Sequence, residues 1–428
     1  MSAVITGGIA VDPVMGTVES RDIGVSGERI GGREAGTGSV DASGCIVMPG
    51  NVCSHHHLYS ALARGMPGPD IPPRTFPEIL ERIWWRLDRA LDHETIRLSA
   101  TLGALEAVKA GTTSIVDHHA SPEAIEGSLD DVAIGLQEVG ARAVVCYEVT
   151  DRGGTDRARA GIAENVRFIR SDRWPLIRGL MGAHASFTIG DETLSALVGE
   201  ARDAGAAVHI HLAEDDCDER HSLEVYGVRT AHRLAEKGAL EEGDLVAHGV
   251  HLDDSEIETV RVSGAWIAHN PRSNMNNGVG YAPVGTMGAR VCLGTDGIDG
   301  DLFAEARSAF FKARETSPEA DPRWVLDRVG AGAALVGSVF GEPAMGTLEA
   351  GAPADLVILE YGAPTPLEAA NLAAHFVFGM GAWHVRDVMI AGTWVVRDRE
   401  HLAVDEAELL AHCRDEAPRL WDRMQRLD

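Results

Sequence analysis

The segment P-G-N-V-C-S-H-H-H-L, from Pro49 to Leu58, ends an apolar run with three consecutive histidines. Three later segments likewise close an apolar run with groups suited to metal binding or proton transfer: V-H-I-H-L-A-E (208–214), L-V-A-H-G-V-H (245–251) and V-C-L-G-T-D-G (291–297). In a (β/α)8 barrel the catalytic groups come from the ends of several strands on one face, so distant positions converge. Neutral imidazoles with one carboxylate suit a zinc-type ion that keeps a place for water. These segments together predict a metal-dependent hydrolase.

Between the two ends of the chain, short apolar runs alternate with helical patterns, which is typical of a parallel α/β fold. The predicted strands are residues 46–52, 114–118, 142–148, 177–183, 207–211, 244–247, 266–269 and 290–294. Helical patterns fill the gaps between them, for example at 93–110 and 191–204, and a helical segment follows the last strand. This alternation favours a closed (β/α)8 TIM-type barrel over an open sheet.

The two ends of the chain carry a different pattern. Residues 1–48 read as short strands punctuated by Gly and Asp at hairpin spacing, and matching strand patterns begin at residues 351 and 385. Neither half is able to close a core alone. We therefore predict a small β-sandwich domain formed from both chain termini, residues 1–50 and 351–428, beside a hydrolase barrel of residues 51–350.

Composition limits the classes of function. The 428 residues are 45% hydrophobic and carry a formal net charge of −27. This charge argues against binding to nucleic acid, whose phosphates demand a basic face, and against an anionic membrane surface. The amino terminus lacks the basic-then-apolar pattern of a signal peptide, and no apolar run is long enough to span a bilayer. We expect a cytoplasmic protein that forms a homo-oligomer.

Residues 59–92 separate the first predicted strand from its helix, which is too long for a bare βα connection. This insertion carries the adjacent tryptophans Trp84 and Trp85 and follows a strand end, so it lies on the catalytic side. Neighbouring residues on a helix diverge by about 100°, so we expect one tryptophan to pack against the barrel and the other to face a pocket. The insertion is predicted to form a lid or a pocket wall.

Two histidine pairs have the spacing of metal ligands. His55 and His57 alternate along an extended segment, so both can share one ion while His56 faces elsewhere. His209 and His211 repeat this spacing. Only one residue of the second pair need be a ligand, and the spacing does not say which.

Three single residues each have two interpretations. Glu214, three residues past His211, could serve as a proton shuttle or could simply start a surface helix in an acidic run. His248 could contact the centre or could be a structural histidine with its hydrogen bonds satisfied. Asp296 could be the anionic ligand and base, or it could cap the next helix.

The motifs identify a family resemblance. H-H-H-L-Y-S-A-L-A-R-G-M, H-I-H-L-A-E, A-H-G-V-H-L, H-N-P-R-S-N and L-G-T-D-G resemble, in this order, the motif series of the amidohydrolase superfamily. The branch that they resemble is the cytosine-deaminase/chlorohydrolase-like aminohydrolases of the ATZ/TRZ type. Within it, W-W-R-L-D-R-A-L-D, D-H-H-A-S-P and H-A-S-F-T-I-G-D-E-T-L are similar to the SsnA-like aminohydrolases. The resemblance covers nearly the whole chain and implies the barrel with its split β-domain.

The resemblance implies one divalent metal ion per chain, zinc in the first place, with iron as the alternative. The metal ligands that it implies are His55, His57, His211 and Asp296. His211 matches the third ligand because the family pattern places the catalytic glutamate three residues later, here at Glu214. No lysine sits in a motif where it could be carbamylated to bridge two metals, which supports a mononuclear site.

The remaining site residues are also implied by the resemblance. Asp296 would act as the base, His248 would contact the attacking water and the substrate, and Glu214 would be the general acid. The residues implied to contact substrate are His184, Asp88, His118 and His119, to which the insertion adds Trp84 and Trp85. The alignment at Asp88 is loose because of the insertion.

The expected reaction is hydrolytic deamination of an amino-substituted nitrogen heterocycle of purine, pterin, pyrimidine or triazine type, with release of ammonia. The tryptophans and pocket histidines suit such a flat, nitrogen-rich small molecule. Hydrolysis of a cyclic amide or of a carbon–halogen bond is the alternative, since fold-level analogy does not choose between them. A non-catalytic metal-binding assembly protein is disfavoured because every expected ligand and proton carrier is present.

Overall fold

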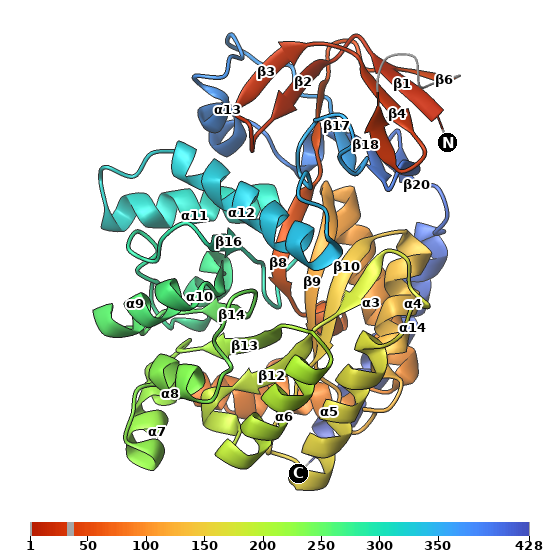
Figure 1. The fold of residues 1–428 in the computed structure, drawn as a ribbon. Coiled ribbons are helices and arrows are strands. Elements are labelled where there is room, and N and C mark those ends of the chain that lie inside the picture. The colour runs from red at the N-terminus through yellow and green to blue at the C-terminus, as the bar shows by residue number, and fades with distance from the viewer. Residues whose placement is uncertain (1, 32–37, 428) are drawn as a thin grey trace.

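The computed structural model describes residues 2–31 and 38–427 and consists of an α/β body beneath a smaller region of β-strands (Figure 1). The strands of the body run downward in Figure 1, away from the small β-region. Their carboxyl ends therefore meet at the end of the body that faces away from that region.

The strands of the body are parallel and buried, and their order in space follows their order in the chain. One sheet contains β8 (Asn51–His56), β9 (Thr112–His119), β10 (Arg142–Tyr147) and β11 (Ile177–Gly179). The other contains β12 (Met181–Ala185), β13 (Val208–Leu212), β14 (Leu245–His248), β15 (Trp266–His269) and β16 (Val291–Leu293). Single parallel bridges join the sheets at Val149–Ala183 and at His56–Asp296. The predicted closed barrel is therefore confirmed only in part: the strands follow one another in the expected order, but single bridges stand at two seams where the hydrogen-bond ladder would have to close.

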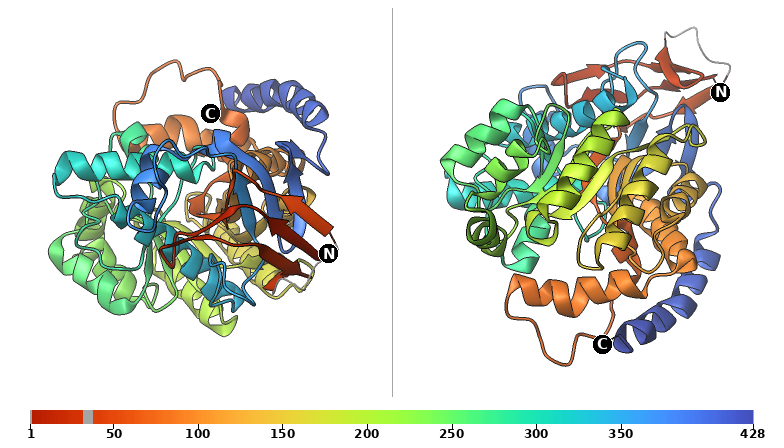
Figure 2. Two further views of the ribbon diagram at one scale, coloured as in Figure 1. Left: turned by 90° about the horizontal axis from the view of Figure 1, so that it is seen from above. Right: turned by 60° about the horizontal axis from the view of Figure 1, so that its bottom comes forward.

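Helices cover the outside of the ring, in the connections between successive strands (Figures 1 and 2). They are α3 (His93–Lys109), α4 (Ser128–Val139), α5 (Thr155–Ile169), α6 (Asp191–Asp203), α7 (Asp216–Tyr226), α8 (Thr230–Glu236), α9 (Asp254–Ser263), α10 (Pro271–Asn277), α11 (Leu302–Thr316) and α12 (Arg323–Phe340). Local sequence fixes several of their ends. Asp92 and Thr95 form a capping box at the start of α3, and Gly140 ends α4 with a φ of 75° that favours glycine.

The small β-region interleaves strands from both ends of the chain. One sheet has the order β5-β4-β1-β6 and the other β20-β19-β18-β17-β7-β2-β3. Their bounds are β1 (Ser2–Thr6), β2 (Ile9–Asp12), β3 (Thr17–Ser20), β4 (Ile23–Ser26), β5 (Arg29–Gly31), β6 (Gly38–Asp41), β7 (Ile46–Pro49), β17 (Leu356–Leu359), β18 (Val385–Ile390), β19 (Thr393–Arg397) and β20 (Glu400–His401). The pairing of β7 with β17 joins the two ends of the chain.

The last helices lie against the body. The short helix α13 (Leu372–Phe378) with the 3-10 turn η4 (Ala382–His384) precedes β18, and α14 (Glu406–Gln425) follows β20. Within α14, the indole of Trp421 donates to the carbonyl of Leu62 at 2.9 Å, and Arg423 donates to the carbonyl of Ala90 at 2.8 Å. The division of the chain into domains at residues 50 and 351 stays a prediction. Helix α14, which falls in the predicted β-domain, contacts residues of the predicted barrel.

The predicted first strand, 46–52, is two strands that belong to different sheets. β7 lies in the small β-region and β8 in the barrel, and Gly50 stands between them. A Cβ at Gly50 would lie 2.1 Å from the side chain of Thr113, so only glycine fits where the chain crosses. The predicted strand 177–183 is likewise divided, into β11 and β12.

The insertion after β8 is helical over much of its length and lies at the carboxyl ends of the strands. It contains η1 (Leu58–Ala63), α1 (Phe76–Ile79), the π-helical turn η2 (Leu80–Trp84) and α2 (Trp85–Ala90). The right-hand view of Figure 2 brings this end forward and shows the orange insertion beside the C-terminal helix α14. The insertion therefore covers the end of the barrel where the predicted site residues meet.

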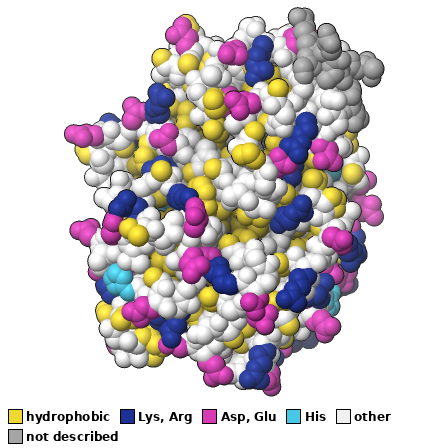
Figure 3. Space-filling view, in the orientation of Figure 1, with side chains coloured by type: hydrophobic (Ala, Val, Ile, Leu, Met, Phe, Trp, Pro, Cys, Tyr) yellow, Lys and Arg dark blue, Asp and Glu magenta, His cyan; other side chains and the backbone are white. Residues whose placement is uncertain are grey.

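Charged side chains of both signs are interspersed over the face drawn in Figure 3, with apolar side chains between them. Among the helices of residues 2–31 and 38–427, the structure contains none that is long and apolar enough to cross a membrane.

Candidate active site

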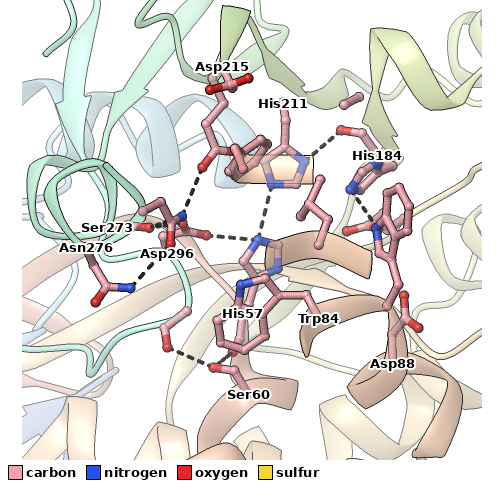
Figure 4. Close-up of a pocket in the computed structure, with 18 of the residues that line it drawn as sticks. His57, Ser60, Trp84, Asp88, His184, His211, Asp215, Ser273, Asn276 and Asp296 are labelled. Carbon is pink, nitrogen blue, oxygen red and sulfur yellow. Dashed lines mark hydrogen bonds and ion pairs between the residues drawn. The ribbon is translucent and has the colours of Figure 1, made fainter. Parts of the chain in front are cut away.

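The predicted ligands come together at the carboxyl ends of β8, β13 and β16. The side chains of His57, His211 and Asp296 point toward one another in Figure 4. The Nε2 atom of His57 lies 3.2 Å from Nε2 of His211 and 3.0 Å from Oδ1 of Asp296. His55 joins them, with its Nε2 atom 3.4 Å from the same carboxylate oxygen. His56 points elsewhere, since its Nδ1 lies 2.8 Å from the hydroxyl of Thr295.

This cluster has the chemistry of a divalent metal site. Nitrogen or oxygen atoms of His55, His211, His248 and Asp296 all lie within 4.8 Å of one another, and all four residues are buried. The buried Nε2 atoms of His55 and His248 have no hydrogen-bond partner among the described residues, as expected of atoms reserved for an ion or its water. Imidazoles with one carboxylate form the donor set of zinc hydrolases, so the residues present fit such an ion.

Second contacts orient two of the imidazoles. Nδ1 of His57 lies 2.5 Å from the carbonyl oxygen of His118, and Nδ1 of His211 lies 2.7 Å from that of His184. A ring whose Nδ1–H donates to a carbonyl presents its Nε2 lone pair to the centre. His209 does not present a nitrogen to this centre and instead lies behind His55. The geometry therefore favours His211 as the ligand of the second histidine pair.

The backbone is strained at two of these positions. Asp296 has a φ of 54° and His248 a φ of 76°, in the left-handed region that side-chain-bearing residues rarely adopt. Such conformations persist where the surroundings over-determine them, and they concentrate at functional sites. The helix-cap interpretation of Asp296 does not account for its geometry, because its carboxylate faces His55 and His57.

Burial and the charge of Asp296 raise the pKa of Glu214 to about 7, although His248 opposes the shift. The Oε2 atom of Glu214 lies 3.6 Å from Nε2 of His248, and the side chain lines the cavity. The neighbouring imidazoles hold the pKa of Asp296 well below its usual value despite burial. Burial lowers the pKa of His57, but the contact with Asp296 outweighs this and raises it to about 9. Two carboxyls with opposite pKa shifts are thus placed side by side.

One short helix, α10, contacts all three residues predicted to be catalytic. The hydroxyl of Ser273 donates to Asp296, and the side chain of Asn274 lies 2.8 Å from Nδ1 of His248. The amide nitrogen of Asn277 donates to Oε1 of Glu214 at 3.2 Å. The motif H-N-P-R-S-N leads into this helix, but none of its residues had a predicted role. That motif was the only available signal.

A cavity of about 300 Å³ opens above the cluster. Its wall includes Trp84, Trp85, Asp88 and His184. Both tryptophans line it, so the expectation that one packs away from the pocket is not met. Both rings are large and only partly buried against the core, so each packs on its surroundings with one part and faces the cavity with another.

His118 and His119 do not line this cavity, contrary to the expected role in substrate contact. β9 continues to His119, so the two side chains face opposite sides of the sheet and both are fully buried. The ring of His118 lies inward, against that of His211 with centroids 4.7 Å apart. His119 points the other way, with its Nε2 2.9 Å from the hydroxyl of Ser121.

Two members of a charged cluster at the cavity wall, Arg152 and Glu148, were missed by sequence reasoning, whereas the third, Asp88, was predicted. Arg152 donates to Oδ2 of Asp88 at 2.8 Å and lies 3.5 Å from Oε1 of Glu148. Its guanidinium carbon is 4.5 Å from the centroid of the Trp85 ring. Burial raises the pKa of Asp88 to about 7 even though Arg152 opposes the shift. A lone arginine after a strand carries no motif, so no sequence signal pointed to it.

Comparison with known proteins places the chain in a family. Residues 46–395 match the amidohydrolase family. The 5-methylthioadenosine/S-adenosylhomocysteine deaminase of Natronomonas pharaonis is 31% identical over 98% of both chains. The 5'-deoxyadenosine deaminase of Methanopyrus kandleri is 31% identical over 88% of this chain and 86% of its own. A zinc-bound adenosine deaminase from Xanthomonas campestris has the same fold, with a TM-score of 0.86, 24% identity and 99% of each chain covered. The chain therefore belongs to the amidohydrolase family.

Proposed function

We propose that the protein is a metal-dependent hydrolytic deaminase whose substrate is a 6-aminopurine nucleoside of the adenosine type. One observation carries the proposal. Glu214 and Asp296 line the cavity beside the imidazole cluster, His248 contacts Glu214 from within that cluster, and the pKa values of the two carboxyls are shifted in opposite directions. Such a pair can remove a proton at one point and deliver one at another. The adenosine-type substrates named for relatives that are 31% identical support the purine assignment.

His55, His57, His211 and Asp296 would hold one divalent ion, for which zinc fits the donor set and iron is the alternative. When bound, the ion would lower the pKa of a water molecule toward neutrality and so supply the nucleophile. We thus propose both the identity of the ion, zinc, and its stoichiometry of one per chain.

The chain's own residues would divide the proton transfers. Asp296, held ionised by the neighbouring imidazoles, accepts the proton of the attacking water. His248 orients this water and stabilises the negative charge that develops as its oxygen attacks the ring carbon. Glu214, whose pKa lies near neutrality, protonates the ring nitrogen. It then receives the water proton from Asp296 and delivers it to the departing amine. The proton that the added hydroxyl group loses as the carbonyl forms restores Glu214. The net reaction converts R–NH₂ and water into R=O and ammonia.

The cavity wall suits a flat ring that carries polar substituents. Trp84 and Trp85 offer aromatic faces for stacking, and His184 lies beside Trp85 with ring centroids 6.2 Å apart. The Oδ1 atom of Asp88 is buried and has no hydrogen-bond partner among the described residues. This oxygen is available to accept a hydrogen bond from a substrate hydroxyl or N–H.

The similarity to SsnA-like aminohydrolases is also a proposal. With it, pterins, pyrimidines and triazines stay alternative substrates. Hydrolysis of a cyclic amide or a carbon–halogen bond remains the alternative activity on this fold. The homo-oligomeric state and the cytoplasmic location stay predictions.

Release of ammonia in a substrate panel tests the proposal. The zinc-loaded protein would be assayed with adenosine, 5'-deoxyadenosine, 5-methylthioadenosine and S-adenosylhomocysteine, and beside them guanine, a pterin, cytosine and an aminotriazine. We expect deamination within the adenosine group, and its loss in Glu214→Gln by about 10²–10⁴-fold with the metal retained. Turnover confined to the other heterocycles would overturn the purine assignment, and near-normal turnover in Glu214→Gln would overturn the role of that residue.

A further inference from the structure

The imidazoles of His55, His57 and His211 differ in the group that contacts their Nδ1 atom. His57 and His211 each place Nδ1 against a main-chain carbonyl oxygen. The Nδ1 atom of His55 instead lies 3.0 Å from Nε2 of a fourth imidazole, that of His209. Both His55 and His209 are completely buried. Thus one ligand depends on a replaceable side chain where the other two depend on the backbone.

The positions of His209 and His211 explain this contact. They alternate along β13, so both side chains point into the barrel, with His209 one layer deeper. Side chains in the interior of such a barrel stack in layers, and here the deeper layer supports the ring of His55. The ring of His118 packs edge-on against His209, with centroids 4.6 Å apart, and restricts its rotation.

The directions of the hydrogen bonds are consistent along the whole chain of contacts. When Nε2 of His55 binds the ion, the proton of this ring is on Nδ1 and is donated to Nε2 of His209 at 3.0 Å. His209 then carries its own proton on Nδ1, which lies 3.7 Å from the sulfur of Cys146. The Cys146 thiol in turn donates to the carbonyl oxygen of Asp117 at 3.7 Å. Each donor has one acceptor, and every group in the relay is neutral.

We propose that His209 is a positioning residue that fixes the tautomer and the ring plane of His55, and that it thereby determines how tightly the centre holds its ion. The inference rests on the proposed metal site. An imidazole that binds a metal through Nε2 needs an acceptor for its Nδ1–H, and loss of such an acceptor typically costs about 10–100-fold in metal affinity or activity. His209 supplies that acceptor from the layer beneath.

A different role for the same residues is a second metal site. Donor atoms of His118, Cys146 and His209 lie within 4.8 Å of one another. Such a site would need a deprotonated Cys146, whereas burial raises the pKa of this thiol well above its usual value. The hydrogen-bond relay accounts for the three residues without a second ion, and the metal content distinguishes the two roles.

The test compares two substitutions of His209 with a matched control. In His209→Gln the amide oxygen can take the place of Nε2 as acceptor, whereas His209→Leu keeps a buried side chain but accepts nothing. His401→Leu makes the same chemical change at a buried histidine of β20, whose imidazole bonds to the carbonyl of Val139 outside the centre. Metal release to a competing chelator and the absorption spectrum of the cobalt-substituted proteins are the measurements, because neither requires turnover.

We expect His209→Leu to release metal about 10–100-fold faster and to have an altered cobalt spectrum. His209→Gln should remain close to the unsubstituted protein, and His401→Leu should not change the spectrum. Equal behaviour of the Leu and Gln variants would overturn the proposal, as would a wild-type content of two ions with one lost in both variants. A protein that holds its ion in this pattern but does not deaminate adenosine-type nucleosides would refute the proposed function and leave this inference standing.

Discussion

Replacing Glu214 by glutamine should stabilise the metal-free protein at alkaline pH. The carboxyl lines the cavity, its side chain is only 13% exposed, and burial with the charge of Asp296 raises its pKa from 4.5 to about 7. In the unfolded chain it would ionise near its ordinary pKa. Folding therefore keeps a proton on this group that the unfolded chain has already lost.

The size of the effect follows from this pKa difference. Between the unfolded and folded pKa values the native state binds more protons, so stability falls as pH rises through that window. Each pKa unit corresponds to about 1.4 kcal/mol, so the raised pKa costs about 3 kcal/mol of stability at pH 8 and about 1 kcal/mol at pH 5.5. Glutamine removes this cost while keeping an oxygen to accept from Asn277.

The assay is denaturation of the chelator-treated proteins at both pH values. For a chain of 428 residues the expected gain at pH 8 is an increase in thermal midpoint of about 3–4 °C. Glu200→Gln, which removes the same charge from an exposed position on α6, is the control and should change stability by less than about 0.5 kcal/mol. A Glu214→Gln variant that is no more stable at pH 8, or whose advantage does not shrink at pH 5.5, would refute the reasoning.

Three further outcomes are expected. In His57→Ala, elemental analysis should find nearly no metal where the unsubstituted protein holds about one ion per chain, because Nε2 of His57 contacts both His211 and Asp296. Two tightly held ions, or no loss of metal in the variant, would contradict the proposed site. Trp84→Leu should lower kcat/KM without changing the melting temperature. Trp85→Leu should lower both, because Trp85 also packs on the guanidinium of Arg152, a contact worth about 0.5–2 kcal/mol. If the two variants behave alike, the two tryptophans do not differ in this way. Arg142→Met should destabilise the fold by about 3–5 kcal/mol with little change in kcat per folded molecule, because Arg142 and Asp355 form a buried pair between β10 and the small β-region.

The sequence predicted the strand ends well because each site residue follows an apolar run. Such runs fill a barrel, and the polar residue that closes one must lie at its rim. The choice between His209 and His211 could not be made in this way, because both point inward and only the layer of the barrel distinguishes them. A different limit applied to His118 and His119: the carboxyl end of β9 lies one residue beyond the predicted end, so the two side chains face opposite sides of the sheet.

Residues that act through other residues were the hardest to predict. Asn277 and Ser273 matter because α10 lies beside β14 and β16, a placement that three-dimensional packing decides. Arg152 reaches Asp88 from a connection more than sixty positions away in the chain, and no local pattern marks it. The break at Gly50 was hidden because the apolar run continues on both sides of the glycine.

The two ends of the barrel have separate roles, and this separation makes the costly site possible. At the amino ends of the strands, the buried pair Arg142–Asp355 and the crossing at Gly50 join the body to the small β-region. At the carboxyl ends, the left-handed backbone of His248 and Asp296 and the raised pKa of Glu214 each cost stability. In barrels of this type, the residues at the amino ends of the strands generally serve stability and those at the carboxyl ends serve catalysis. Because the costs at Glu214 arise from the environment that its proposed chemistry needs, variants that relieve them should gain stability and lose turnover together.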